Sequence, residues 1–304
     1  TRLFGAPAEI ARTVRARVRA ELGLPISIGV ARTKHLAKIA SQVAKPDGLT
    51  VVDPETELAF LHNLPVSLMW GVGPATEARL AEAGITTIGH LAASAPQAVE
   101  RLLGHAVGTK LADLAWNRDP RQVQTRRRAR SAGAQSALGR QPATERVFKP
   151  TLHHLADRIG ARLRAKSLSG RTITVRVRFA DLRSVTRSIT LPAPVSATRA
   201  LAEIAEDLVR GALADHPAER TISMLGVSVS QLETQASLQL ELQLGAADDG
   251  RRPGTRAGIA RARADQAIDA IRKRFGGHAV DYASATRAER SVPDEFRRLA
   301  EKDL

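Results

Sequence analysis

The sequence predicts a multidomain α+β chain, and three observations support that prediction. A short buried strand, a lysine-bearing helix and a tight turn follow one another over residues 27–49. Two helices then flank a Gly-x-Gly turn at residues 71–73, and the pattern of residues 134–229 has the order β-α-β-β-α-β. A chain of 304 residues with 43% hydrophobic residues is long enough for two or three such domains.

The first domain is predicted from its apolar spacing. Apolar residues three to four positions apart predict helices over residues 7–21 and 34–43, and β-branched residues predict a strand over residues 25–30. Pro46 disfavours helical geometry at the residue before it, and an Asp-Gly pair follows. Lys45 is therefore expected to project from a fixed turn.

The second domain is expected to be all-helical and to contain a helix-hairpin-helix motif. A short helix over residues 57–61 precedes Gly71-Val72-Gly73, and a second helix over residues 75–83 follows. Glycine lets backbone N–H groups approach a phosphate closely, and the next helix adds its positive N-terminal end. Such a turn alone is more often a simple connection between two helices, but the nearby lysines favour phosphate binding. A looser copy is predicted at residues 103–108, before a helix at 109–116.

Positive charge is concentrated in one part of the chain. The formal net charge is +15, and residues 121–190 contain 17 Lys or Arg against only Glu145, Asp157 and Asp181. Residues 121–130, with five arginines and no acid, are predicted to be a linker. Charge gathered in this way indicates a surface for a polyanion, with nucleic acid as the leading partner. The alternative is a solvated, arginine-rich surface of the kind that a high-GC genome favours.

Beyond the linker the pattern predicts a split βαβ module with helices on one face of an antiparallel sheet. The expected elements are strand 134–140, helix 150–166, strands 172–179 and 184–191, helix 196–212 and strand 221–229.

One face of that sheet is predicted to be basic and hydroxylated. In strand 172–179, Arg176 and Arg178 alternate with apolar residues, and Arg187 lies on the neighbouring strand. Arginine and hydroxyl donors suit a nucleic-acid backbone, while an aromatic content of 3% argues against base-specific reading of single strands. An ordinary solvated sheet face is the alternative, which the lack of acids makes weaker.

Taken in order, these features resemble the Y-family of translesion DNA polymerases, closest to the DNA polymerase IV group, over residues 7–244. The resemblance rests on SIGVARTKHLAKIASQVAKPDG, on WGVGPATEARLAEAGI, on the basic linker and on the β-α-β-β-α-β order. It implies a partial palm at 1–54, a thumb at 55–120, a basic tether at 121–131, a little finger at 132–244 and a C-terminal extension at 245–304.

The resemblance also implies functional residues. Lys45 matches the palm lysine that contacts the triphosphate of the incoming dNTP. Gly71, Val72 and Gly73 would hold the backbone of the primer-template DNA. By region and charge, the tether and sheet would grip the template through Arg126, Arg128, Arg176, Arg178 and Arg187.

The metal site is expected to lie outside this sequence. In the family, carboxylates hold two Mg²⁺ ions for nucleotidyl transfer, and the segments that carry them precede the helix at Pro7. Asp248-Asp249 in a loop and His153-His154 on a helix are not expected to replace them. We therefore predict no catalytic residue and no metal ligand in this chain, which should be inactive alone.

Two interpretations follow. The chain is either most of a DNA polymerase IV whose catalytic part is missing, or a non-catalytic DNA- and clamp-binding accessory module. The genomic sequence just upstream of Thr1 discriminates between them: an in-frame Asp-x-Asp strand and Ser-x-Asp-Glu motif supports the first, and a stop codon with a native start supports the second.

A second partner is implied by the segment QLELQL at residues 239–244. It resembles the peptide with which this group docks on the sliding clamp, through Gln239, Leu240, Leu242 and Leu244. The alternative is a final strand with alternating leucines. Further on, residues 262–275 predict an amphipathic helix with Ile271 and Phe275 on its apolar side, and 297–302 a short helix.

Composition predicts the setting. With no cysteine, no secretory segment and no long apolar run, the chain is expected to be cytoplasmic, free of disulfides and of membrane spans, and monomeric. A palm without most of its sheet is expected to leave Ile26, Ile28 and Val30 without strand neighbours.

Overall fold

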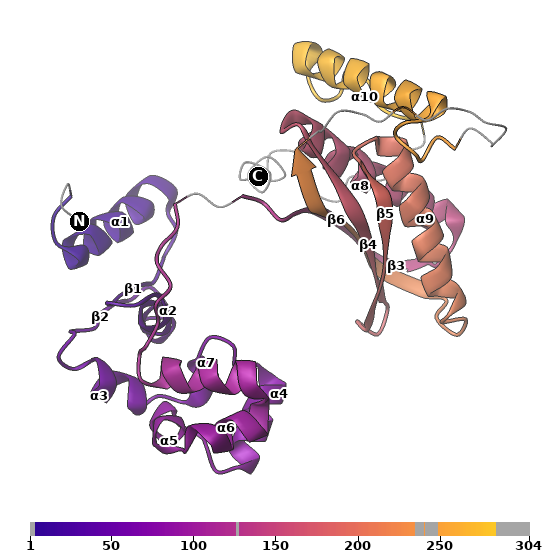
Figure 1. Ribbon diagram of the computed structural model, residues 1–304. Coiled ribbons are helices and arrows are strands. Elements are labelled where there is room, and N and C mark those ends of the chain that lie inside the picture. The colour runs from indigo at the N-terminus through magenta and orange to yellow at the C-terminus, as the bar shows by residue number, and fades with distance from the viewer. Residues whose placement is uncertain (1–3, 126–127, 235–239, 241–248, 284–304) are drawn as a thin grey trace. The chain divides into compact units, whose positions relative to one another are not determined.

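The computed structural model describes residues 4–125, 128–234, 240 and 249–283. Contacts divide the chain into an N-terminal unit, residues 1–126, and a C-terminal unit, residues 127–304 (Figure 1). The break falls inside the predicted basic tether, whose described residues form no regular element before β3.

The N-terminal unit opens with the predicted palm segment. Helix α1 (Pro7–Leu22) ends at Gly23, which has a left-handed φ of 67°. Strand β1 (Ile28–Val30) is followed by α2 (Lys34–Val43), whose N-cap Thr33 accepts a hydrogen bond from Leu36 N. The prediction that β1 lacks a neighbour is wrong, because β2 (Leu49–Val51) pairs with it in parallel and leaves β1 half-buried.

Helices form the rest of this unit. They are α3 (Glu57–His62), the 3-10 turn η1 (Val66–Leu68), α4 (Pro74–Glu82), α5 (Ile88–Ala93), α6 (Pro96–Leu103) and α7 (His105–Ala115). Leu36 and Ile39 of α2 pack in one core with Leu61, Leu80 and residues of α5 to α7. The predicted boundary at 54/55 therefore lies between elements that share a single core.

The second predicted hairpin is tighter than expected. Gly104, with φ 86°, makes the whole turn, and Gly108 lies inside α7, which begins at His105 rather than Thr109. A Cβ on Gly108 would lie 2.6 Å from Glu100 Cα in α6. Gly108 therefore sets how closely α6 and α7 approach.

We expect Gly108→Ala to lower the free energy of unfolding by about 1–3 kcal/mol, because two backbones must separate. Gly211→Ala is the matched control: Gly211 is also helical, but a Cβ added there would meet nothing within 4 Å. That substitution should be neutral or stabilising by up to about 1 kcal/mol. Urea unfolding of both variants measures the difference, and equal stabilities would contradict the close-packing argument.

The C-terminal unit has the predicted β-α-β-β-α-β order, with longer elements. Its sheet contains β3 (Ser131–Pro142), β4 (Leu168–Phe179), β5 (Ser184–Val195) and β6 (Thr221–Thr234) in the antiparallel order β3-β6-β4-β5. Helices α8 (Glu145–Ala165) and α9 (Thr198–Ala214) cover one face (Figure 1). Alternate residues of β4, from Ile173 to Phe179, are fully buried against them.

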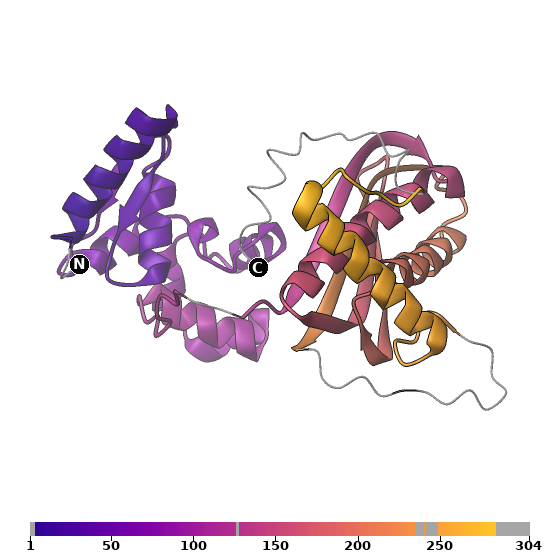
Figure 2. The ribbon, with the colours of Figure 1, turned by 90° about the horizontal axis from the view of Figure 1, so that it is seen from above.

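A third helix joins this unit from beyond the predicted boundary at residue 244. Helix α10 (Arg256–Phe275) lies across α8 and α9 (Figure 2). Its packing differs from the predicted amphipathic one, because Ile271 is 40% and Phe275 66% exposed. The side that faces the domain is charged instead, and Asp265 is only 1% exposed.

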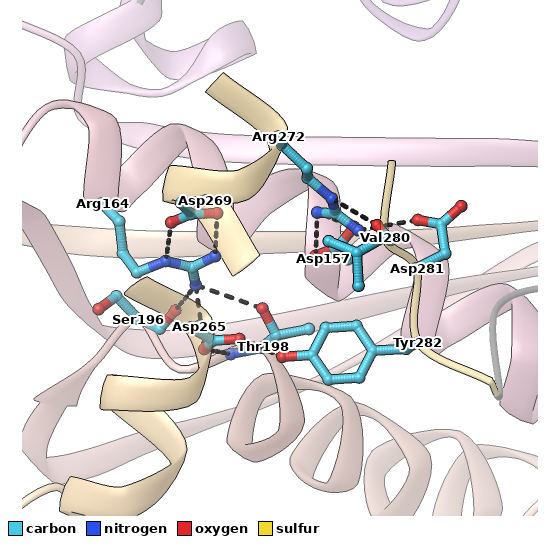
Figure 3. Close-up of polar contacts among 10 residues, drawn as sticks. All are labelled: Asp157, Arg164, Ser196, Thr198, Asp265, Asp269, Arg272, Val280, Asp281 and Tyr282. Carbon is cyan, nitrogen blue, oxygen red and sulfur yellow. Dashed lines mark hydrogen bonds and ion pairs between the residues drawn. The ribbon is translucent and has the colours of Figure 1, made fainter. Parts of the chain in front are cut away.

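Ion pairs and hydrogen bonds attach α10 to the domain (Figure 3). Arg164, in the last turn of α8, reaches Asp265 at 3.2 Å and Asp269 at 2.6 Å. Asp265 also accepts a hydrogen bond from Thr198 N at 2.7 Å, at the start of α9, where Ala197 offers no side-chain cap. Helix α10 thus supplies the N-cap that α9 lacks in its own sequence.

A second group of contacts closes the same interface (Figure 3). Arg272 donates two hydrogen bonds of 2.9 Å to Asp157 of α8. The Tyr282 hydroxyl donates to Asp265, and burial together with this bond raises the pKa of Tyr282. Because no apolar stripe directs this packing, sequence periodicity could not reveal it.

Candidate nucleic-acid interface

The helix-hairpin-helix turn is shaped as the sequence predicts. Gly71 has φ 106°, which favours glycine, and Val72 N donates to Met69 O at 3.1 Å. Gly73 is the N-cap of α4 and has no side chain to accept hydrogen bonds from the backbone N–H groups of the first turn. Pro74 is the first residue of the helix. The free N–H groups and the helix dipole leave this end suited to an anion such as a backbone phosphate.

A cationic cluster beside this turn was missed from sequence. Trp70 is 44% exposed, and the Arg121 guanidinium lies 4.0 Å from the centre of its ring. Lys110 Nζ approaches the same ring at 5.7 Å. The sequence feature that could have indicated this cluster is Trp70, a tryptophan next to Gly71 in a chain with only 3% aromatic residues. The cluster adds positive charge at the hairpin.

Asp119 connects this cluster to the palm segment. It accepts two hydrogen bonds from the Arg121 side chain, at 2.6 and 2.8 Å, and one from His35 N in the first turn of α2, at 3.1 Å. The bonds with Arg121 lower the pKa of Asp119 to about 2. The carboxylate therefore stays charged and holds the end of the helical domain to the start of α2.

His35 is a buried titratable group in this junction. Its side chain is fully buried, and neither ring nitrogen has a hydrogen-bond partner. Burial lowers the pKa of His35 to about 4; nearby Arg121 and Lys38 act in the same direction, and Asp119 opposes them. The imidazole is therefore neutral at pH 7.

This burial predicts a pH dependence. A histidine whose pKa is lower in the folded state contributes stability above its unfolded pKa and loses it as pH falls toward about 4. The N-terminal unit should lose about 1 kcal/mol between roughly pH 6.5 and 5.5. Urea unfolding followed by tryptophan fluorescence measures this. His35→Leu should flatten the profile, whereas exposed His90→Leu should not; an unchanged profile in His35→Leu would refute the assignment.

Lys45 lies where the sequence placed it, in the turn after α2. Its side chain is exposed and donates a hydrogen bond to Gln42 Oε1 at 2.7 Å. The peptide bond to Pro46 is cis, and Asp47 receives ion pairs from Arg15 and Arg19 of α1. The turn is thus attached to α1 and presents Lys45 on the surface.

The uncovered face of the C-terminal sheet is basic and hydroxylated. Along residues 172–178 of β4, the side chains opposite the helices are Thr172, Thr174, Arg176 and Arg178. Their paired neighbours on β3, β5 and β6 contain no acid, and the polar ones are Ser131, Gln135, Ser184, Thr186, Ser188, Thr190, Ser228 and Ser230. We call these residues the hydroxyl face. Arg176 is exposed, whereas Arg178 donates to Ser223 Oγ at 3.0 Å.

Arg187 does not belong to the hydroxyl face. It pairs in register with Val175, which is buried under the helices, so its side chain lies on the helix side of the sheet. There it forms an ion pair with Asp215, the C-cap of α9, at 2.6 Å. The expectation that Arg187 lies with Arg176 and Arg178 is therefore wrong; sequence placed it on the right strand but did not define the register.

Other predicted residues lie at the edges of the described chain. Arg128 is exposed and donates to Thr234 Oγ1 at 3.1 Å, at the end of β6. Leu240 is 69% exposed. Arg126, Gln239, Leu242 and Leu244 lie outside the described residues.

Acidic and histidine side chains do not gather into a metal site in the described part of the chain. Within those ranges, no group of three or more His, Cys, Asp or Glu side chains could hold a metal ion. His153 is buried and packs edge-on against Tyr282, 4.7 Å between ring centres. Magnesium therefore does not fit the residues described. No described helix is long and apolar enough to cross a membrane.

Comparison with known families agrees with the order of these elements. Residues 1–42 match the impB/mucB/samB family, residues 54–85 the IMS family HHH motif, and residues 129–242 the impB/mucB/samB family C-terminal domain. Helix α10 lies beyond the last match.

Individual relatives support the same assignment. DNA polymerase IV 2 of Mesorhizobium japonicum is 71% identical over 100% of this chain and 74% of its own length. DNA polymerase IV of Desulfatibacillum aliphaticivorans is 34% identical over 93% of this chain and 69% of its length. A solved Y-family DNA polymerase chimera has a TM-score of 0.64 and 25% identity, covering 75% of this chain and 64% of the chimera.

The hairpin, the hydroxyl face and these relatives together point to one class of protein, the polymerases that act on DNA. The chain belongs to the Y-family DNA polymerases, and within them to the DNA polymerase IV group.

Proposed function

We propose that this chain binds primer-template DNA for translesion synthesis, gripping the backbone without reading its sequence. The observation that carries the proposal is the hydroxyl face, where Arg176, Arg178 and hydroxyl groups stand without an acid among their paired neighbours. Such donors contact phosphates of any sequence. The relatives named DNA polymerase IV make DNA the polyanion concerned.

The helix-hairpin-helix turn is proposed as a second contact on the same DNA. The uncapped start of α4 and the glycines at 71 and 73 offer backbone N–H groups to one phosphate. Lys110 and Arg121 beside Trp70 supply charge around it. Lys45, exposed in its turn, is proposed to meet the triphosphate of an incoming dNTP.

We propose that nucleotidyl transfer uses a divalent metal ion held by residues other than those described. Mg²⁺ is the expected ion, because it prefers carboxylate ligands. The described carboxylates form no metal-binding group. We propose that the chain of 304 residues binds DNA but does not extend a primer by itself. It is expected to act as a monomer.

The test uses the 304-residue chain with a fluorescent primer-template. Its dissociation constant should rise steeply with salt and be the same for unrelated sequences. With Mg²⁺ and dNTPs, no extension product should form. Binding that survives high salt, or that requires one sequence, would contradict the DNA proposal; measurable extension would contradict the proposal that the chain does not extend a primer by itself.

Docking on the sliding clamp is proposed through residues 239–244, which would attach the polymerase to its template by raising its local concentration. Replacing Gln239, Leu240 and Leu242 by Ala should abolish recovery of the chain on immobilised clamp while DNA binding is unchanged. Ala substitution of Leu22 and Leu24, also exposed leucines, is the control. Clamp binding that survives the first triple substitution would rule out this peptide.

A further inference from the structure

Helix α10 divides its charges between two sides. Its only acids, Asp265 and Asp269, turn toward the domain and pair with Arg164 (Figure 3). The arginines that also face inward, Arg261 and Arg272, pair with Glu203 and Asp157. Every acid of this helix is therefore used in attaching it to α8 and α9.

The charged residues on the outer side of α10 are all cations, next to the exposed Ile271 and Phe275. Arg256, Arg263, Lys273 and Arg274 are exposed, and none forms a hydrogen bond or ion pair with another described residue. At about 100° a residue, Arg256, Arg263 and Arg274 project in nearly one direction, along about 27 Å of helix axis. We call these three arginines the outer cationic row; Lys273 projects about 100° away from it. Exposed alanines, Ala260, Ala267 and Ala270, lie between these arginines, and the Arg274 guanidinium lies 5.0 Å from the centre of the Phe275 ring.

Acids on neighbouring elements do not cancel this charge. Glu203 of α9 is bound by Arg261 and lies close to Arg199, and Asp207 is bound by Arg251 at 2.6 Å. These acids are neutralised locally, so the outer cationic row keeps an uncompensated positive potential.

The row is separate from the hydroxyl face. Helices α8 and α9 cover the opposite side of the sheet from that face, and α10 packs on those helices through Arg164, Asp157 and Glu203 (Figure 2). The domain therefore presents positive charge on two sides with a helix layer between them. One straight duplex cannot contact both sides at once.

We propose that the outer cationic row of α10 is a second nucleic-acid site, which binds the phosphate backbone of a duplex segment other than the one on the hydroxyl face. The ligand class follows from charge complementarity: arginines in line without acids bind a polyanion, and the chain belongs to a family that acts on DNA. The inference builds on the proposed DNA binding and adds bridging of two segments.

The experiment uses the full 304-residue chain held on an immobilised duplex of about 30 base pairs, with capture of a second, fluorescent duplex as the readout. Arg256→Gln, Arg263→Gln and Arg274→Gln combined should reduce second-duplex capture at least about fivefold. Retention on the first duplex should stay within about twofold. The salt slope for the second duplex should fall by about 0.9 for each lost contact.

The matched control removes the same charge elsewhere. Arg12→Gln, Arg17→Gln and Arg101→Gln combined, on exposed positions of α1 and α6, should capture the second duplex like the unmodified chain. Equal capture by the α10 variant and the unmodified chain, or equal loss in both variants, would overturn the inference. Retention without second-duplex capture refutes this inference alone, whereas failure to be retained refutes the proposed function. Thermal melting confirms that the variants are folded.

Discussion

Asp265→Ala is expected to lower the free energy of unfolding of the C-terminal unit by about 3 kcal/mol. The substitution removes a 1%-exposed carboxylate that pairs with Arg164, itself 8% exposed at its side chain. It also removes the acceptor for Thr198 N at the start of α9. Breaking a buried pair by deleting one partner costs several kcal/mol, and losing a helix cap about 1 kcal/mol more; Asp269 retains part of the pairing.

Urea unfolding followed by far-UV circular dichroism measures the loss, and hydrogen exchange locates it. Amide protection should fall first at Thr198 and in α10, while β4 and β6 keep theirs. Asp265→Asn, which keeps an oxygen acceptor but not the charge, should give an intermediate loss. Asp215→Ala is the control, because the Asp215 pair with Arg187 is exposed and such pairs contribute about 0–1 kcal/mol. If Asp265→Ala and Asp215→Ala unfold alike, α10 is not an integral part of the domain.

Thr174→Glu is expected to weaken primer-template binding about 30-fold at low salt. Thr174 lies in the middle of the hydroxyl face, between Ser188 of β5 and Ser228 of β6. A carboxylate about 8 Å from a bound phosphate would repel it by about 2 kcal/mol at an effective dielectric constant of about 20, which corresponds to this loss of affinity. Fluorescence anisotropy with a labelled primer-template measures the affinity.

The control for this prediction is Thr13→Glu, which places the same charge on an exposed position of α1. It should change affinity less than about twofold, since it adds only to the net charge. Raising the salt concentration should reduce the difference between the two variants, because screening weakens the repulsion. An affinity for Thr174→Glu equal to that of Thr13→Glu would show that DNA does not lie on the hydroxyl face.

Several parts of the fold could be predicted because they depend on local patterns. The alternation in β4 placed Ile173 and Val175 on the buried side and Arg176 and Arg178 on the other, as observed. Glycine at 71 and proline at 74 defined the hairpin, since few other residues adopt those backbone angles without strain.

Contacts between distant residues could not be predicted in the same way. The pairing of β1 with β2 and the register of β5 both depend on strands elsewhere in the sequence, which a local pattern of residues does not identify. Arg187 was therefore assigned to the wrong side of the sheet, because a strand prediction does not say which of its two faces meets the helices.

The segment from Ser27 to Leu49 and the Gly71 turn, read as sequence alone, were enough to indicate the family. They did so because a strand-helix-turn order and a Gly-x-Gly hairpin are encoded by neighbouring residues. The tertiary structure alone decided that α10 belongs to the sheet domain and that Arg256, Arg263 and Arg274 face outward. The two acids of α10, Asp265 and Asp269, pair with Arg164, about a hundred positions earlier in the chain, and sequence periodicity does not predict such a pairing.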